Sequence, residues 1–225
     1  MKWLRVAGKF LISVGVGVLL FVAWVLWGTG IYTSQQQDRL TEELEQLPDI
    51  PPVSKKADGK DNGGSRFVGP PNDYQPAAGE PVFALTIPRI EVQNVVVQGV
   101  EVEDLKQGPG HYPDCREGFE EPLCTSAEEV WPGEEGRVIL SGHRTTYGAP
   151  FGRLDELEPG DEIITNPQWG EVVYKVTKIE VVSPNATDIA NPQPGDGKAE
   201  IVLTTCHPEF SASQRLIVFG EMETA

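Results

Sequence analysis

The sequence has 225 residues, of which 39% are hydrophobic, and its formal net charge at pH 7 is −16. This length fits one ordinary domain with accessory segments, or two small domains. The acidic charge argues against nucleic acid as a partner, because binding to phosphates requires a basic surface. Most of the 19 prolines and 24 glycines lie between short apolar runs, which is typical of short strands joined by turns.

An uncharged apolar run, Phe10–Trp27, is about long enough to cross a bilayer as a helix. No Lys or Arg follows it until Arg39, whereas three basic residues precede it: Lys2, Arg5 and Lys9. The positive-inside rule therefore predicts a cytoplasmic N-terminus at 1–9, a single-pass membrane anchor at 10–31 and an extracellular remainder. The alternative is a cleaved signal peptide, but its apolar region would usually be shorter, and no small-residue cleavage site follows Trp27. A buried core helix is disfavoured because the run has no polar stripe.

Residues 32–79 are predicted to form a juxtamembrane helix and then a flexible spacer. Leucines recur with helical spacing before the prolines that begin at Pro48. The stretch 53–78 is poor in large aliphatic residues, so it cannot bury enough surface to offset the entropy of ordering. We therefore expect the folded extracellular domain to occupy residues 80–225.

The rest of the sequence predicts many short strands and little helix. Short helices are expected only at Val102–Gln107 and Phe151–Leu157, and Asp114–Trp131 is expected to be an insertion loop. This pattern predicts an all-β sandwich or closed barrel, and the lack of amphipathic helices between strands disfavours a parallel α/β fold. The strand-like segments are short and rich in β-branched residues: Pro81–Ile90, Val95–Val100, Arg137–Ser141, Glu162–Thr165, Glu171–Val182, Glu200–Cys206 and Arg215–Glu221.

The chain has three cysteines, and an exported protein usually pairs its cysteines. Cys115 and Cys124 are nine positions apart in one loop and are expected to form a disulfide; the alternative is two unpaired thiols. Cys206 is then left over. It could be a small buried hydrophobic residue, but it follows a strand and precedes a turn, where its thiol can be exposed and act as a nucleophile.

A cysteine nucleophile needs a nearby imidazole or positive charge to favour its thiolate. His143 ends a predicted strand, as Cys206 does, and two strand ends of one sheet can meet. Gly142 before it would allow another backbone or a substrate to approach closely. His111 is the reserve candidate. His207 is a poor partner, because neighbouring side chains of an extended strand point to opposite faces, and it is assigned to the turn.

Arg215 begins the next predicted strand after Cys206. It is either an exposed charge without a role or a third catalytic residue that stabilises the oxyanion of a tetrahedral intermediate. No C-x2-C or H-x3-H pair and no phosphate-binding glycine motif occurs in the sequence. We therefore expect neither a metal nor a cofactor.

These motifs resemble the signature of the sortases, the cysteine transpeptidases of the bacterial cell surface. The likeness covers about residues 81–220. The stretches GHRTTYGAPFGRLDELEPGDEI and LTTCHPEFSASQRLIVFG are most similar to class E, with class D as a near neighbour. Three stretches carry the resemblance: Gly142-His143-Arg144 after an apolar strand, Leu203-Thr204-Thr205-Cys206 at a strand end, and Arg215-Leu216 nine residues later.

The resemblance implies an eight-stranded sortase β-barrel and a role for each catalytic residue. Cys206 would attack the Thr–Gly bond of an LPxTG-like or LAxTG-like C-terminal sorting signal of a surface protein, and a thioester would form. His143 would act as general acid and base, and Arg215 would hold the oxyanion or the substrate. An amine of a peptidoglycan precursor or of a pilin would resolve the thioester. Flanking residues would contact the substrate: Tyr112, Thr145, Tyr147 and Thr205.

Residues 48–80 lack the Asp-Pro-aromatic lid of pilin-polymerising sortases, which favours a wall-anchoring role over pilus assembly. The insertion with Cys115 and Cys124 departs from the family pattern and could reshape one rim of the site. Two alternatives remain. An L,D-transpeptidase would carry an arginine almost directly after its cysteine, where this chain has Pro208. A non-enzymatic, membrane-tethered β-domain that binds a wall component would simply bury Cys206.

Overall fold

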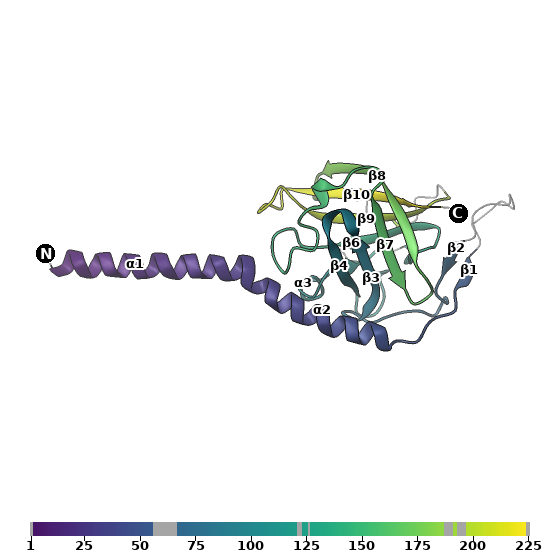
Figure 1. Cartoon of the computed structure of the whole chain (residues 1–225), viewed down its shortest axis with the longest axis horizontal. Helices are drawn as coiled ribbons and strands as arrows, with labels where there is room; N and C mark the ends of the chain where they lie inside the picture. The colour runs from purple at the N-terminus through teal and green to yellow at the C-terminus, as the bar shows by residue number, and fades with distance from the viewer. Residues whose placement is uncertain are drawn as a thin grey trace.

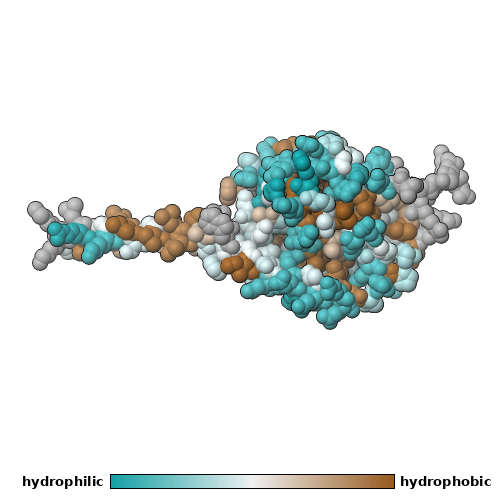
Figure 2. All heavy atoms as spheres, viewed as in Figure 1, coloured by the Kyte–Doolittle hydropathy of each residue, from teal (hydrophilic) through white to brown (hydrophobic). Residues whose placement is uncertain are grey.

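The computed structural model describes residues 2–55, 67–120, 123–125, 127–186, 191–192 and 197–223. It begins with one long helical segment, made of α1 (Lys2–Ala23), a π-helical turn (Trp24–Gly28) and α2 (Thr29–Gln46). The apolar part, Arg5–Ala23, has a mean hydropathy of 2.2 and is not buried by the rest of the chain. It stands away from the domain as an apolar belt (Figure 2), and its length and composition fit a membrane span.

Eight strands form a closed barrel, which confirms the fold that the resemblance to the sortases implied. Their order around the barrel is β10-β8-β7-β3-β4-β5-β6-β9 (Figure 1). Most neighbours are antiparallel, but β4 with β5 and β6 with β9 are parallel. The strands are β3 (Pro81–Ile87), β4 (Val92–Gln98), β5 (Gly110–His111), β6 (Gly136–Ser141), β7 (Glu162–Pro167), β8 (Val172–Val182), β9 (Ala199–His207) and β10 (Gln214–Met222).

The core fills the barrel because alternate residues of each strand point inward. In β9, Ile201 and Leu203 belong to the main core cluster, whereas Val202 packs on the outer face against Ile217 of β10. The alternation continues to the end of β9, and it determines the side on which Cys206 emerges.

Several local predictions need correction. The segment Pro81–Ile90 is not one strand, because Pro88 starts a 3-10 turn, Pro88–Ile90, after β3. The predicted helix at Phe151–Leu157 is reduced to one 3-10 turn, Leu154–Glu156. Strand β5 is absent from the strands that the sequence predicts, because its two residues are too few to show a period-2 pattern. The helical turn near Val102 is confirmed as α3 (Val102–Leu105).

The segment before the barrel contacts it at several points. Strands β1 (Val53–Lys55) and β2 (Phe67–Gly69) pair with each other, and the Val68 amide donates to the Gly133 carbonyl at 3.0 Å. The Tyr74 ring packs edge-on against two tryptophans of the domain. This part of the predicted spacer therefore lies on the barrel, whereas residues 56–66, also predicted to be flexible, lie outside the described residues.

The predicted disulfide between Cys115 and Cys124 is confirmed. It closes the insertion loop, which a short bridge between Asp114 and Thr125 also holds together. Arg116, next to the first cysteine, donates to the buried Glu129 carboxylate at 2.8 Å. The insertion is thus tied to the barrel at its base.

Candidate active site

Cys206 and Arg215 come together across the ladder between β9 and β10. The two strands are antiparallel, and these two residues are direct partners in the register. Residues directly opposite each other project from the same face, with Cβ atoms about 4.5–5.5 Å apart. The Arg215 guanidinium is held by nearby main-chain carbonyls, since its Nη1 donates to those of Ala212 at 3.1 Å and Gln214 at 3.0 Å.

The thiol of Cys206 lies on the outer face of the barrel. Thr205, one residue earlier, is buried, and its hydroxyl donates to the Gly142 carbonyl at 2.8 Å. Because side chains alternate along a strand, the next residue points outward. Cys206 is only half-buried and is a free thiol. The structure therefore contradicts the alternative in which this cysteine is a buried core residue.

His143 is brought beside Cys206 by the parallel pairing of β6 with β9. Ser141 pairs with Thr204, and the Gly142 amide donates to the same Thr204, at its carbonyl, at 3.1 Å. One residue beyond His143, Arg144 contacts His207. The register offset between the strands is 204 − 141 = 63, and 206 − 143 is also 63. His143, two residues beyond the end of β6, is therefore at the position that would face Cys206 if the pairing continued, while Arg215 is the partner of Cys206 on its other side.

The His143 imidazole is partly withdrawn from water. Burial lowers the pKa of His143 below its ordinary value of 6.5, because the charged imidazolium is the form that burial disfavours. Tyr147 covers the ring, with the two ring centroids 5.0 Å apart and their planes inclined by 33°. Nε2 of His143 is buried and has no hydrogen-bond partner within the described part of the chain. A neutral imidazole with an unengaged nitrogen can exchange a proton with a thiol or an amine.

Position 142 requires a glycine because a larger residue would clash with its surroundings, a constraint that the sequence did not reveal. A Cβ at this position would lie 2.6 Å from the ring of Phe151, which is completely buried. The Phe151 amide also donates to the His143 carbonyl at 3.1 Å. Gly142 therefore allows the loop to fold back and fix the backbone of His143, rather than leaving room for a substrate.

Arg144 is a residue of the site that sequence reasoning missed. Its side chain is 3% exposed and forms an ion pair with Asp155 at 2.9 Å. Its Nη1 donates to Nδ1 of His207 at 2.8 Å, and it lies 3.4 Å from the Cys206 carbonyl oxygen. The guanidinium thus ties the backbone after His143 to the backbone that carries Cys206. Its position directly after the predicted catalytic histidine was the only signal in the sequence.

The reserve candidate, His111, has a structural role. It is 1% exposed, and its ring is held by Gln98 at 3.1 Å and by the Val130 carbonyl at 3.0 Å. Its Nδ1 also lies 3.3 Å from the carboxylate of Glu129. A ring with both nitrogens engaged in the interior is not placed to act on a substrate outside the barrel. His207, assigned to a turn, is the last residue of β9 and accepts from Arg144.

The residues predicted to contact substrate occupy different positions. Tyr112 follows β5, next to the inward His111, and its amide donates to the Ile139 carbonyl of β6 at 2.9 Å. Burial raises the pKa of Tyr112. Thr145 and Tyr147 lie in the segment after His143 and are half-buried. Thr205 instead points inward and joins the two strand ends.

No metal site is formed in the part of the chain that the structure describes. None of its His, Cys, Asp and Glu side chains come together in groups of three or more that could hold an ion.

Comparisons with known proteins give matches to one family. Residues 85–223 match the family described as the sortase domain. Sortase SrtE1 of Streptomyces coelicolor is 34% identical over 228 residues, covering 97% of this chain and 56% of that protein, so the chain spans little more than half of this relative. Sortase D of Bacillus subtilis is 34% identical over 155 residues, covering 67% of this chain and 68% of that protein.

Solved structures give the same result for the fold. The crystal structure of sortase E1 from Streptomyces coelicolor, with a tripeptide in the active site, superimposes with a TM-score of 0.56. The sequence identity is 32%, and the alignment covers 66% of this chain and 91% of that one. A sortase D5 transpeptidase of Clostridium perfringens gives a TM-score of 0.54 at 25% identity, covering 66% of this chain and 82% of that one.

Proposed function

This chain belongs to the sortase family of cysteine transpeptidases, with class E and class D relatives, and on this premise we propose that it sorts surface proteins to the cell wall. It cleaves an LPxTG-like or LAxTG-like C-terminal signal between Thr and Gly. It then transfers the threonine acyl group to an amine of a cell-wall precursor.

One observation carries the proposal: Cys206 has an arginine as its partner on β10, and a histidine follows the end of β6, its other neighbouring strand. Arg215 is its direct partner on β10, and His143 follows the end of β6 at the matching position. A nucleophile, a general base and a fixed cation on one outer face are the groups that acyl transfer from a peptide requires.

The first half of the reaction forms a thioester. The neutral His143 imidazole takes the thiol proton as the Cys206 sulfur attacks the threonine carbonyl carbon. Arg215 stabilises the negative charge that develops on the carbonyl oxygen. The imidazolium then returns its proton to the departing glycine nitrogen, and the C–N bond breaks to leave the acyl group on sulfur.

The second half reverses the roles. His143 removes a proton from the incoming amine, which attacks the thioester carbonyl, and Arg215 again stabilises the oxyanion. The C–S bond then breaks, the thiolate recovers the proton from the imidazolium, and a new amide is released. The lowered pKa of His143 suits it to act as a base in both halves near neutral pH.

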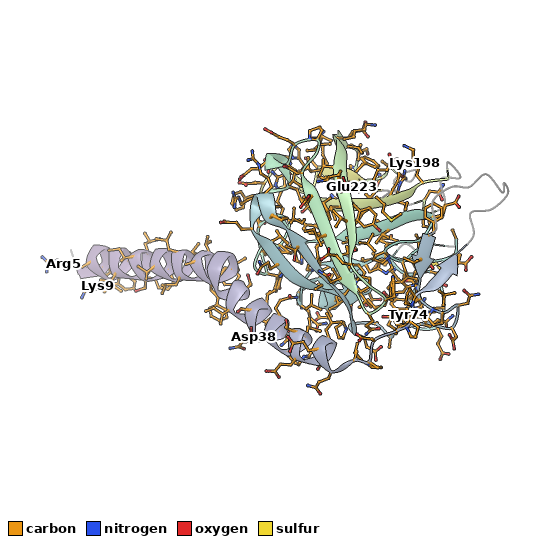
Figure 3. The ribbon with its side chains drawn as sticks, turned by 45° about the vertical axis from the view of Figure 1, so that its right-hand side comes forward. Arg5, Lys9, Asp38, Tyr74, Lys198 and Glu223 are labelled. Atoms are coloured by element: carbon orange, nitrogen blue, oxygen red, sulfur yellow. A yellow bond between two sulfur atoms is a disulfide. The ribbon has the colours of Figure 1, made fainter. Side chains whose placement is uncertain are left out.

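We assign membrane anchoring to α1, with the N-terminus in the cytoplasm and the barrel outside the cell. Arg5 and Lys9 lie at the end of α1 far from the barrel (Figure 3), which supports this orientation under the positive-inside rule. The enzyme and a substrate held in the membrane by its own C-terminal segment then meet on one face of the bilayer.

The test uses the full chain in detergent micelles with a panel of signal peptides. We expect cleavage between Thr and Gly, and a new amide when an amine is added, both detected by mass spectrometry. Cys206→Ala should give neither product. If no peptide is cut at Thr–Gly, or if Cys206→Ala cuts at the wild-type rate, the proposed function is wrong. A pilin-derived lysine that outcompetes wall-precursor amines would reassign the enzyme to pilus assembly.

A further inference from the structure

The helix that leaves the membrane span also contacts the loop that covers His143. Thr29 is two residues beyond Trp27, where the uncharged apolar run Phe10–Trp27 ends, which is about 3 Å along a helix. The Thr29 hydroxyl accepts a hydrogen bond from the Tyr147 amide at 3.1 Å. Tyr147 in turn packs on His143. Only two contacts therefore separate the catalytic histidine from the end of the membrane span.

The start of α2 packs closely on this side of the domain. Gly30 lies against the backbone of Gly148, since a Cβ on Gly30 would be 3.7 Å from the Gly148 amide nitrogen. Thr33 is buried, and its hydroxyl donates to the Lys106 carbonyl at 2.8 Å. These contacts fix the first turn of α2 beside the segment that follows His143.

Further along, Gln37 fastens α2 to an open part of a strand edge. Its side-chain amide accepts from the Val95 amide at 2.7 Å, and donates to the Val95 carbonyl at 3.0 Å and the Gln107 carbonyl at 2.8 Å. Strand β5 pairs only with Val97 and Gln98 of β4, so the side chain of Gln37 takes the place of a missing strand neighbour at Val95. Leu40, which is completely buried, packs on Val95 and Val97.

These contacts set the direction in which the barrel faces. α2 continues from α1 through one π-helical turn, so its rigid attachment fixes the barrel relative to the membrane span. β6 and β9 end, and β10 begins, at the end of the barrel toward α1, whereas the C-terminus lies at the opposite end (Figure 1). The connection 208–213 between β9 and β10 therefore lies at the end of the barrel toward α1.

This connection presents an aromatic side chain to its surroundings. Phe210 is 74% exposed, and its φ of 61° places it in the left-handed region that a bulky residue rarely adopts. Exposed aromatic residues on a soluble surface are unfavourable, but they are favourable at the level of lipid headgroups. Glu209 beside it would repel anionic lipids, so the contact would depend on apolar burial rather than on charge.

We propose that the catalytic end of the barrel faces the membrane surface, with segment 208–213 in contact with lipid headgroups and α2 as the brace that holds it there. The inference rests on the proposed anchoring by α1. It places Cys206 close to the plane in which a membrane-held sorting signal emerges. A peptide bond a long way from the bilayer would then be a poor substrate for the anchored enzyme.

Two exposed glutamates at opposite ends of the barrel allow a matched test. Glu209 lies in segment 208–213, and Glu171 lies in the turn between β7 and β8 at the far end. Glu209→Cys and Glu171→Cys are made separately in the full chain carrying Cys206→Ala, labelled with a fluorophore and reconstituted into phosphatidylcholine nanodiscs. Some of the lipid carries a spin label on its headgroup, which quenches only a nearby fluorophore.

We expect quenching at position 209 to be several-fold stronger than at 171, and to be unchanged when anionic lipid is added. Equal quenching at the two sites, in protein that co-purifies with the nanodiscs, would overturn the proposal while leaving the anchor intact. Protein that fails to co-purify with the nanodiscs would overturn the anchor and the proposal together.

A second pair of variants tests the brace. Gln37→Ala with Leu40→Ala removes the attachment of α2, whereas Thr41→Ala with Glu42→Ala alters two exposed positions of the same helix. The first pair should bring quenching at 209 down toward the value at 171, and the second should leave it unchanged. Unchanged quenching in the first pair, with the barrel still folded by circular dichroism, would refute α2 as the brace.

Discussion

Arg215 is the direct cross-strand partner of Cys206, so the guanidinium and the thiol leave the barrel from the same face at neighbouring positions. The relationship is built into the β9–β10 hairpin and needs no other element. It places a permanent positive charge where negative charge would develop during attack by sulfur. The arginine is further restrained by its bonds to the carbonyls of Ala212 and Gln214.

Arg215→Lys should therefore be far from a conservative change. Lysine keeps the charge but loses the planar fork that can bind an oxyanion and backbone carbonyls together. We expect kcat/KM for a sorting-signal peptide to fall by about 10²–10³-fold, the usual loss for an oxyanion donor. Gln214→Ala, one residue earlier and on the other face, serves as the control and should stay near wild type. Wild-type turnover by Arg215→Lys would remove this residue from the mechanism.

Burial of His143 predicts an acid shift that can be measured directly. Its pKa should lie below 6.5, and Tyr147→Ala should raise it toward 6.5, because water then reaches the ring and stabilises the imidazolium. The measurement is an NMR titration of isotope-labelled histidine, with the His143 signal assigned from His143→Gln. Tyr32→Ala, on an exposed face of α2, is the control and should leave the titration unchanged. A wild-type pKa at or above 6.5 would contradict the account.

The two arginines of the loop after His143 should differ sharply in their effect on stability. Arg144 is almost fully buried between Asp155 and His207, whereas Arg153 pairs with glutamates at the surface. Arg144→Gln removes a buried guanidinium and its bonds to Asp155 and His207, and should lower the free energy of unfolding by about 1–3 kcal/mol. Turnover should fall as well, because the strand end that carries Cys206 loses its tie.

Arg153→Gln provides the matched control for this prediction, since exposed ion pairs are screened by water and contribute little. Its denaturation midpoint and its turnover should both remain close to wild type. Urea denaturation followed by tryptophan fluorescence measures stability, and peptide cleavage measures turnover. Equal effects of the two variants would show that Arg144 does not hold the site together.

Substitutions of His111 and His143 should have different effects, the first on stability and the second on turnover. His111→Ala removes a buried ring that contacts Gln98, Glu129 and Val130, so it should lower the midpoint of thermal unfolding. The fraction that remains folded should keep its turnover. His143→Ala should do the reverse, with a loss of roughly 10²–10⁴-fold in turnover, as for a general acid–base, and little loss of stability. The opposite pattern would exchange the two assignments.

The strands and the three proposed catalytic residues could be anticipated from local patterns, whereas the choice of a barrel over a sandwich came from the resemblance to the sortases. Period-2 alternation marks most strands, and a cysteine or histidine at a strand end has a defined direction. The closed barrel, its family and the disulfide between Cys115 and Cys124 are confirmed. The roles of Cys206, His143 and Arg215 remain predictions, which the geometry supports.

The features that could not be predicted from the sequence depend on contacts formed only when the chain folds. Arg144 meets His207 across 63 positions, and Gln37 bonds to Val95 across 58. Neither contact leaves a periodic pattern, because each depends on a single polar side chain. The need for glycine at position 142 could not be predicted either, because it arises from contact with Phe151, which a loop brings back onto this position.

The central claim is that Cys206 forms a covalent acyl intermediate with the substrate, and the mass of the intact protein tests it most directly. The full chain is incubated with a signal peptide without an added amine, quenched in acid and weighed by mass spectrometry. The account predicts an adduct equal to the peptide up to its threonine, located on Cys206, removed by hydroxylamine and absent from Cys206→Ala. Peptide cleavage at Thr–Gly with no adduct on Cys206, or with an adduct elsewhere, would contradict it.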